Sequence, residues 1–146
     1  MKKIVYLDTS ALAKWYLNEP RSDAVEKYIQ EHGPVAISDL TVVEMRSLLA
    51  RRRREKHIDA TTETRVFASL QEDMRQRFLV CYPLPNELAA AAINLISSLP
   101  HVPLRTLDAL HLAIAKEIDA ATVVTADRVM VVGAAAMGFS VARFDR

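Results

Sequence analysis

The sequence has one cysteine, so no disulfide can form within the chain, and it has no long apolar run. Cys81 lies in an apolar stretch that is typical of a strand, and we expect a small core residue in a reducing compartment. Residues 4–7 are apolar, but Asp8 follows at once, far short of a secretion signal or a membrane span. We therefore expect a cytoplasmic protein with no membrane partner.

The sequence also has almost no net charge. Its 19 Lys and Arg residues nearly balance its 18 Asp and Glu residues, and a formal charge of +1 gives no global argument for a nucleic-acid partner. Any basic partner surface must therefore be local. No linker, internal repeat or low-complexity segment divides the 146 residues, which have an ordinary globular composition. We predict a single domain over residues 1–146.

Short apolar runs without polar alternation indicate strands that are buried on both faces. Such runs cover residues 4–7, 35–37, 78–82, 121–125 and 139–142, the last of them as an edge strand. Segments of helical periodicity separate them, in the order β-α-α-β-α-α-β-α-α-β-α-β. This order predicts an α/β fold of three layers, with helices on both faces of a central parallel sheet of four to five strands.

The helices are expected to begin at polar residues that cap their first turn. The predicted N-caps are Thr9 or Ser10, Ser38, Asn86 and Thr106. The predicted helices cover residues 11–17, 22–31, 39–54, 60–77, 87–99, 107–117 and 129–137. Only short connections remain between these elements.

One acid lies in a helix that is apolar nearly all round. The helix predicted over residues 107–117 offers no polar face to water, so we expect it to be buried, with Asp108 in its first turn. An ionised carboxylate at the edge of a core needs compensation. Two explanations stay open: a favourable interaction with the helix dipole, or a metal ion shared with other carboxylates.

Three further acids are predicted at the same place. Asp8 follows the first strand and Asp127 follows the fourth, and right-handed crossovers bring the carboxyl ends of parallel strands to one edge. Glu44 lies four residues from both Leu40 and Leu48, which places it on an apolar helical stripe. Alternatively, Asp8 is only a turn residue or a helix cap. Glu44 could also pair with a base such as Arg46, or the buried face of its helix could be rotated away from the predicted one.

Four carboxylates at one edge would repel one another unless a cation compensates them. Oxygen ligands without Cys or a committed His favour Mg²⁺ or Mn²⁺ over zinc. Such an ion binds phosphate oxygens and activates water. The acids therefore indicate hydrolysis of a phosphodiester.

The same residues resemble the motifs of PIN-domain ribonucleases, specifically the VapC-type toxins of type II toxin–antitoxin systems. The matching blocks are Leu7-Asp8-Thr9-Ser10-Ala11-Leu12, Glu44 with Arg46, Leu107-Asp108-Ala109-Leu110-His111-Leu112-Ala113, and Val124-Thr125-Ala126-Asp127. The resemblance covers essentially the whole chain. It implies a PIN-like fold and a Mg²⁺- or Mn²⁺-dependent endoribonuclease with Asp8, Glu44, Asp108 and Asp127 as its catalytic and metal-binding acids. It further implies support from Ser10 or Thr125, a homodimer, an RNA substrate and a cognate antitoxin that occludes the site.

Two other functions fit part of this pattern. A haloacid-dehalogenase-like phosphatase also begins with a strand that ends in Asp, but it needs a second acid two residues later, where this chain has Ser10. A non-catalytic module that binds RNA or a protein on the same fold would be expected to lose one of the four acids to an amide. All four are acids.

Two surface features have open roles. The basic run Arg51, Arg52, Arg53 and Arg54 points in nearly every direction around its helix, so it is either a solvated helix end or an RNA contact. Trp15, Tyr16 and Leu17 are more apolar surface than one side of a short helix can bury, which favours a homodimer. His111, three residues after Asp108, is expected to be a packed residue beside the site and not a metal ligand.

Overall fold

Five parallel strands form the central sheet of this computed structural model, which describes residues 2–146. They are β1 (Val5–Leu7), β2 (Val35–Ser38), β3 (Leu79–Tyr82), β4 (Thr122–Thr125) and β5 (Ser140–Arg143). Their order across the sheet is β3-β2-β1-β4-β5, so β1 lies at the centre and β5 at an edge. The predicted parallel sheet, its strand number and the order of the elements are confirmed.

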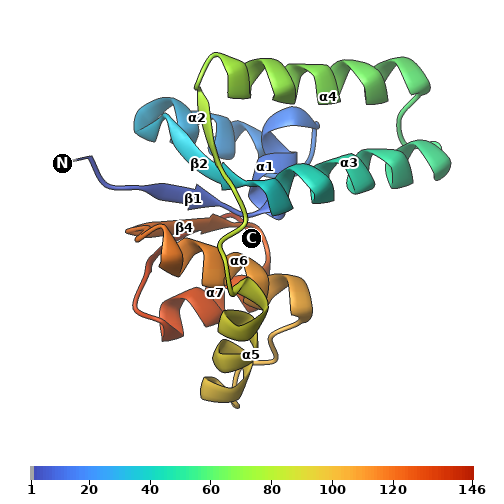
Figure 1. Cartoon of the computed structure of the whole chain (residues 1–146). Helices are drawn as coiled ribbons and strands as arrows, with labels where there is room; N and C mark the ends of the chain where they lie inside the picture. Colours follow the sequence, from blue (N-terminus) through green and yellow to red (C-terminus); the bar gives the residue numbers. More distant parts are fainter. Residues whose placement is uncertain (1) are drawn as a thin grey trace.

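Helices cover both faces of this sheet within residues 2–146 (Figure 1). One face carries α1 (Thr9–Tyr16), α2 (Ser22–His32), α3 (Asp39–Arg54) and α4 (Ala60–Arg75). The other carries α5 (Leu88–Ser98), α6 (Thr106–Glu117) and α7 (Arg128–Ala136). Neighbouring strand residues enter opposite layers: Leu7 and Val124 pack under the first group of helices, and Tyr6 and Val123 under the second. This alternation explains why the strands are apolar throughout.

Three predicted N-caps are wrong. Asp8, and neither Thr9 nor Ser10, caps α1, because its Oδ1 accepts the backbone N–H of Ala11 at 3.1 Å. Thr106 is the first residue of α6 and not its cap. Oδ2 of Asp108 accepts the backbone N–H of Arg105, so Arg105 takes the cap position and the helix begins one residue earlier than predicted. Asn86 is likewise not a cap, since the residue before α5 is Glu87 in a left-handed conformation. The Ser38 cap is confirmed.

The buried stripe of α3 differs from the predicted one by a single position. Its buried residues are Thr41, Met45 and Leu49, whereas Leu40 and Leu48 are only half buried. One residue corresponds to a rotation of about 100° around a helix. Glu44 therefore lies on the flank of the stripe, half exposed, and not in the middle of it.

The predicted surplus of apolar surface on α1 is also wrong. Leu17 is buried and Trp15 and Tyr16 are half buried, because α2, α3 and α4 pack against that end of α1. The exposed large apolar residues lie elsewhere: Val43, Phe78, Leu84, Ile93, Ile96, Leu107 and Val132.

Cys81 is half buried and not a full core residue. Burial, with a hydrogen bond from its thiol to Asp39, raises the pKa of Cys81 to about 12, so the thiol stays protonated. Across residues 2–146, none of the helices combines the length and the apolar character that crossing a membrane requires.

Candidate active site

The four predicted acids line one pocket of about 410 Å³. Each comes from a different place in the fold: Asp8 follows β1, Glu44 lies on α3, Asp108 in the first turn of α6, and Asp127 after β4. The remaining lining residues are Thr9, Ser10, Arg105, Thr106, Leu107 and His111. The structure therefore brings together side chains that lie up to 119 positions apart in the sequence, from Asp8 to Asp127.

Asp8 is the most enclosed of these acids, with 4% of its surface exposed. Its carboxylate accepts hydrogen bonds from Ser10 Oγ at 2.7 Å, Thr125 Oγ1 at 2.5 Å and the backbone of Ala11 at 3.1 Å. Burial nevertheless raises the pKa of Asp8, although the nearby His111 and these donors act in the opposite direction. A cation in the pocket would therefore stabilise the ionised form of Asp8.

Two side chains donate hydrogen bonds to the carboxylate of Glu44. Thr9 Oγ1 donates to its Oε1 at 2.8 Å, and Nε2 of His111 donates a close hydrogen bond to the same oxygen. Burial would raise the pKa of Glu44, but the hydrogen bond and charge of His111 outweigh burial and leave the pKa below its usual value. Arg46 does not pair with Glu44; it binds Glu63 on α4 at 3.0 Å.

His111 connects Glu44 to the core. Only 4% of its surface is exposed, and its Nδ1 lies 2.7 Å from the hydroxyl of Tyr6, which is also 2.9 Å from Ser38 Oγ. Burial raises the pKa of Tyr6, so the phenol remains protonated. His111 is a packed residue beside the acids, as predicted. Tyr6 and Thr9 were not predicted to take part.

Asp108 and Asp127 share an arginine that sequence reasoning missed. Arg105 Nε donates to Oδ2 of Asp108 at 2.9 Å, and its Nη2 donates to Oδ1 of Asp108 at 3.3 Å and to Asp127. Hydrogen bonds to Asp108 first, then to Asp127, raise the pKa of Arg105. The spacing of three residues between Arg105 and Asp108 at a helix start is the signal that could have indicated this pair.

Ser10 and Thr125 join Asp8 to the start of α7. Their hydroxyl oxygens lie 3.2 Å apart, and each donates to Asp8. Ser10 Oγ also accepts the backbone N–H of Ala126 at 2.8 Å, and Thr125 Oγ1 accepts that of Asp127 at 3.0 Å. Both residues therefore lie between Asp8 and the segment that leads to Asp127, and their supporting role stays a prediction.

The donor set fits a hard divalent cation, since it consists of carboxylates backed by hydroxyl groups. As the side chains of residues 2–146 stand, however, no three His, Cys, Asp or Glu residues are grouped closely enough to hold a metal ion. The guanidinium of Arg105 bonds to two of the acids, and His111 bonds to a third. Metal binding would therefore require these side chains to rearrange.

The basic run lies outside this pocket. Arg51 pairs with Glu55 at 3.7 Å, Arg52 with Glu19 at 2.5 Å and Arg53 with Glu63 at 2.6 Å. Arg51, Arg53 and Arg54 are exposed at the end of α3, while Arg52 is half exposed. Three of the four arginines thus form ion pairs with neighbouring acids, and both interpretations of the run, a solvated helix end and an RNA contact, stay predictions.

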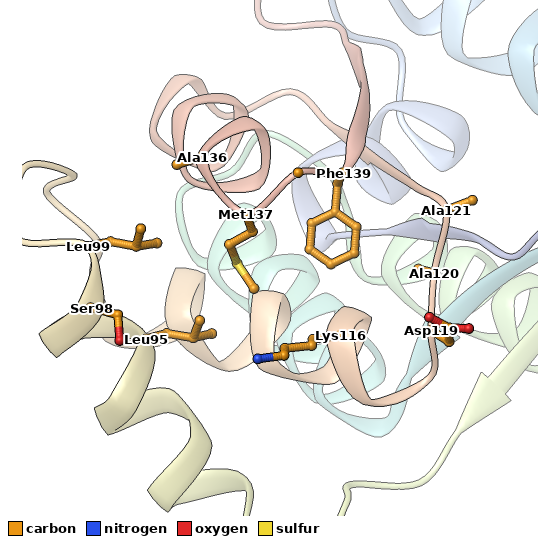
Figure 2. Close-up of a pocket in the computed structure, with 11 residues that line it drawn as sticks. Leu95, Ser98, Leu99, Lys116, Asp119, Ala120, Ala121, Ala136, Met137 and Phe139 are labelled. Carbon is orange, nitrogen blue, oxygen red and sulfur yellow. The ribbon is translucent and has the colours of Figure 1, made fainter.

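Figure 2 shows the side chains that line a second pocket, of about 490 Å³. It lies at the end of the sheet where β4 and β5 begin, away from the pocket around Asp8. It is placed there by Ala120 and Ala121, which precede β4, and by Gly138 and Phe139, which precede β5. Asp119 is its one acid among the described residues. This pocket is larger than the one around Asp8, but it offers no carboxylate cluster for the chemistry considered above.

Comparison with known proteins agrees with the geometry. The PIN-domain family pattern matches residues 5–134. Ribonuclease VapC46 of Mycobacterium tuberculosis is 34% identical over 123 residues, which cover 78% of this chain and 75% of that protein.

Two solved structures show the same fold at low sequence identity. The M. tuberculosis toxin VapC20, which cleaves the sarcin–ricin loop, is similar with a TM-score of 0.71 and 17% identity, over 92% of this chain and 95% of its own. DNA-bound VapBC from Salmonella typhimurium is similar with a TM-score of 0.71 and 15% identity, over 97% of this chain and 98% of its own.

Proposed function

The chain belongs to the PIN-domain family, and we propose that it is a metal-dependent endoribonuclease, the VapC-type toxin of a toxin–antitoxin pair. The observation that carries this proposal is the single pocket that carboxylates from four separate parts of the fold line together. This observation comes from the structure and does not depend on the family pattern. A single acid at the edge of a core needs only one local partner, whereas four acids in one pocket favour a divalent cation.

In this proposal Asp8, Glu44, Asp108 and Asp127 hold Mg²⁺ or Mn²⁺ and form the catalytic site. The bound ion would neutralise the carboxylates, make water more acidic and polarise the oxygens of a phosphodiester. Ser10 and Thr125 orient Asp8 through the hydrogen bonds that they donate. Thr9 and His111 fix Glu44 and favour its ionised form, in which the carboxylate is ready to bind a cation or to accept a proton.

The proposed partners are RNA, a cognate antitoxin and a second copy of the chain. The relatives support the antitoxin, because one similar structure is a VapBC complex. The homodimer is supported by α5, which has no charged residue and exposes Ile93 and Ile96 by 63% and 44%. Light scattering that found only monomers at every concentration would contradict the homodimer.

The test of the activity compares Asp108→Asn with the parent in cleavage of a mixed RNA pool. With Mg²⁺ or Mn²⁺ the parent should cleave and the variant should be at least about 100-fold slower, because a charged ligand is lost. A matched control is Asp119→Asn, which removes a carboxylate at the other pocket, where Asn tolerates the left-handed backbone at φ 58°. Its activity should equal that of the parent.

Two results would reject the proposal. One is cleavage by the parent that persists in excess chelator, which would exclude a metal requirement. The other is full activity of Asp108→Asn. If the parent binds RNA and never cleaves it, the alternative of a non-catalytic RNA-binding module on this fold is favoured instead.

A further inference from the structure

Arg105 is the only Arg or Lys among the described residues that line the acidic pocket. Its guanidinium forms a two-pronged contact with Asp108 and extends to Asp127, so one cation joins two of the four acids. Planar guanidinium groups suit such bidentate contacts with carboxylates.

The two partners of Arg105 differ from it in burial. The side chain of Asp108 is 8% exposed and that of Asp127 is 28% exposed, whereas that of Arg105 is 62% exposed. Among residues 2–146, the hydrogen bonds of its guanidinium go to these two carboxylates and to no other group. The two carboxylates are thus more enclosed than the guanidinium, which can move into solvent once their negative charge is compensated in another way.

We propose that Arg105 is a built-in competitor of the metal ion: it neutralises Asp108 and Asp127 in the metal-free protein and leaves them when the ion binds. The inference rests on the metal site proposed above. It adds a residue whose positive charge offsets the negative charge of two of the acids in the metal-free protein. It also sets the direction of a measurable effect, since a ligand that must displace an internal cation binds more weakly than one that enters a free site.

Two other roles for Arg105 predict different results. If it only fastens the start of α6, its loss should destabilise the protein and leave metal affinity unchanged. If it orients the carboxylates for the ion, its loss should weaken metal binding. Competition alone predicts tighter metal binding together with lower stability in chelator.

The experiment measures Mn²⁺ and Mg²⁺ binding by isothermal titration calorimetry, and thermal unfolding in chelator, for the parent and Arg105→Met. The variant should bind the ion about 1.4- to fivefold more tightly for each exposed ion pair that no longer competes. Its melting temperature in chelator should be lower than that of the parent. Arg105→Lys, which keeps the charge but not the planar fork, should fall between the two in affinity and guards against misfolding of the Met variant.

Arg75→Met is the matched control, because Arg75 is an exposed arginine that pairs with Glu72 on α4, outside the pocket. It should leave metal affinity unchanged. Equal or weaker metal binding by Arg105→Met would overturn the competition while leaving the metal site in place. Absence of metal binding by both the parent and Arg105→Met would instead overturn the metal site, and the competition with it.

Discussion

The hydroxyl of Tyr6 lies 2.7 Å from Nδ1 of His111, although the two residues are 105 positions apart in the chain. The other imidazole nitrogen of His111 donates to Glu44. A path of hydrogen bonds thus connects the centre of the sheet with one of the pocket acids, and through His111 it links Glu44 to Tyr6, which does not line the pocket.

The first prediction concerns His111→Leu. Because His111 is the main cause of the lowered pKa of Glu44, its loss should let burial raise that pKa. The acidic limb of the pH–rate profile for RNA cleavage should then move to higher pH. Tyr6→Phe is the graded comparison, since it leaves the imidazole in place but removes one of its hydrogen-bond partners; its shift should be smaller. If the acidic limb of His111→Leu is identical to that of the parent, the pKa of Glu44 does not depend on His111.

The second prediction concerns the pH dependence of stability in chelator. The folded-state pKa of Asp8 is raised, so Asp8 binds its proton more tightly in the folded protein than in the unfolded chain. Its contribution to stability is then fully present below the unfolded pKa and is lost as pH rises through the folded value. Asp8→Asn cannot ionise and should be more stable than the parent near pH 7, with the advantage shrinking toward pH 4.

Thermal melts of the parent and Asp8→Asn across this pH range measure the effect. Asp59→Asn is the opposite control: the backbone hydrogen bond from Thr62 lowers the pKa of Asp59, so its ionised form stabilises the fold above the unfolded pKa. A stability difference between Asp8→Asn and the parent that is the same at pH 4 and pH 7 would contradict a raised pKa of Asp8.

The third prediction concerns the basic end of α3. If Arg51 and Arg54 touch RNA phosphates, replacing both with Ala should weaken RNA binding regardless of sequence. The slope of log affinity against log salt should fall by about 0.7 for each phosphate of a single strand that is no longer neutralised. Arg52 and Arg53 are less suitable for this test, because their ion pairs with Glu19 and Glu63 join α3 to other parts of the fold. An unchanged slope would identify the run as solvated surface.

Sequence patterns predicted the acids for reasons that are local. Asp8 and Asp127 follow apolar strand segments, and Asp108 begins a helix with no polar face, so each position could be placed from its neighbours in the chain. Glu44 lines the same pocket as the other three acids, although the stripe that suggested it was off by one residue. One residue is a rotation of about 100° around a helix, so Glu44 reaches the pocket from the flank of the buried stripe and not from its middle.

The contacts that organise the acids could not be predicted in the same way. Thr9 reaches Glu44 across 35 positions, Tyr6 reaches His111 across 105, and Arg105 reaches Asp127 across 22. Such pairs depend on the order of the strands and on how the helices pack against the sheet, which patterns within a single helix or strand do not specify. Arg105 is the clearest case, since an exposed arginine is ordinary in any surface segment.

The central position of β1 has a consequence for how this fold can diverge. The chain leaves β1 toward β2 on one side and returns to β4 on the other, and the helices that follow cover opposite faces. A crevice must therefore open beyond the end of β1, whatever side chains stand there. A descendant with amides in place of the acids would keep the cavity while losing its affinity for cations, so catalysis could disappear by a few substitutions and leave a folded binding protein behind.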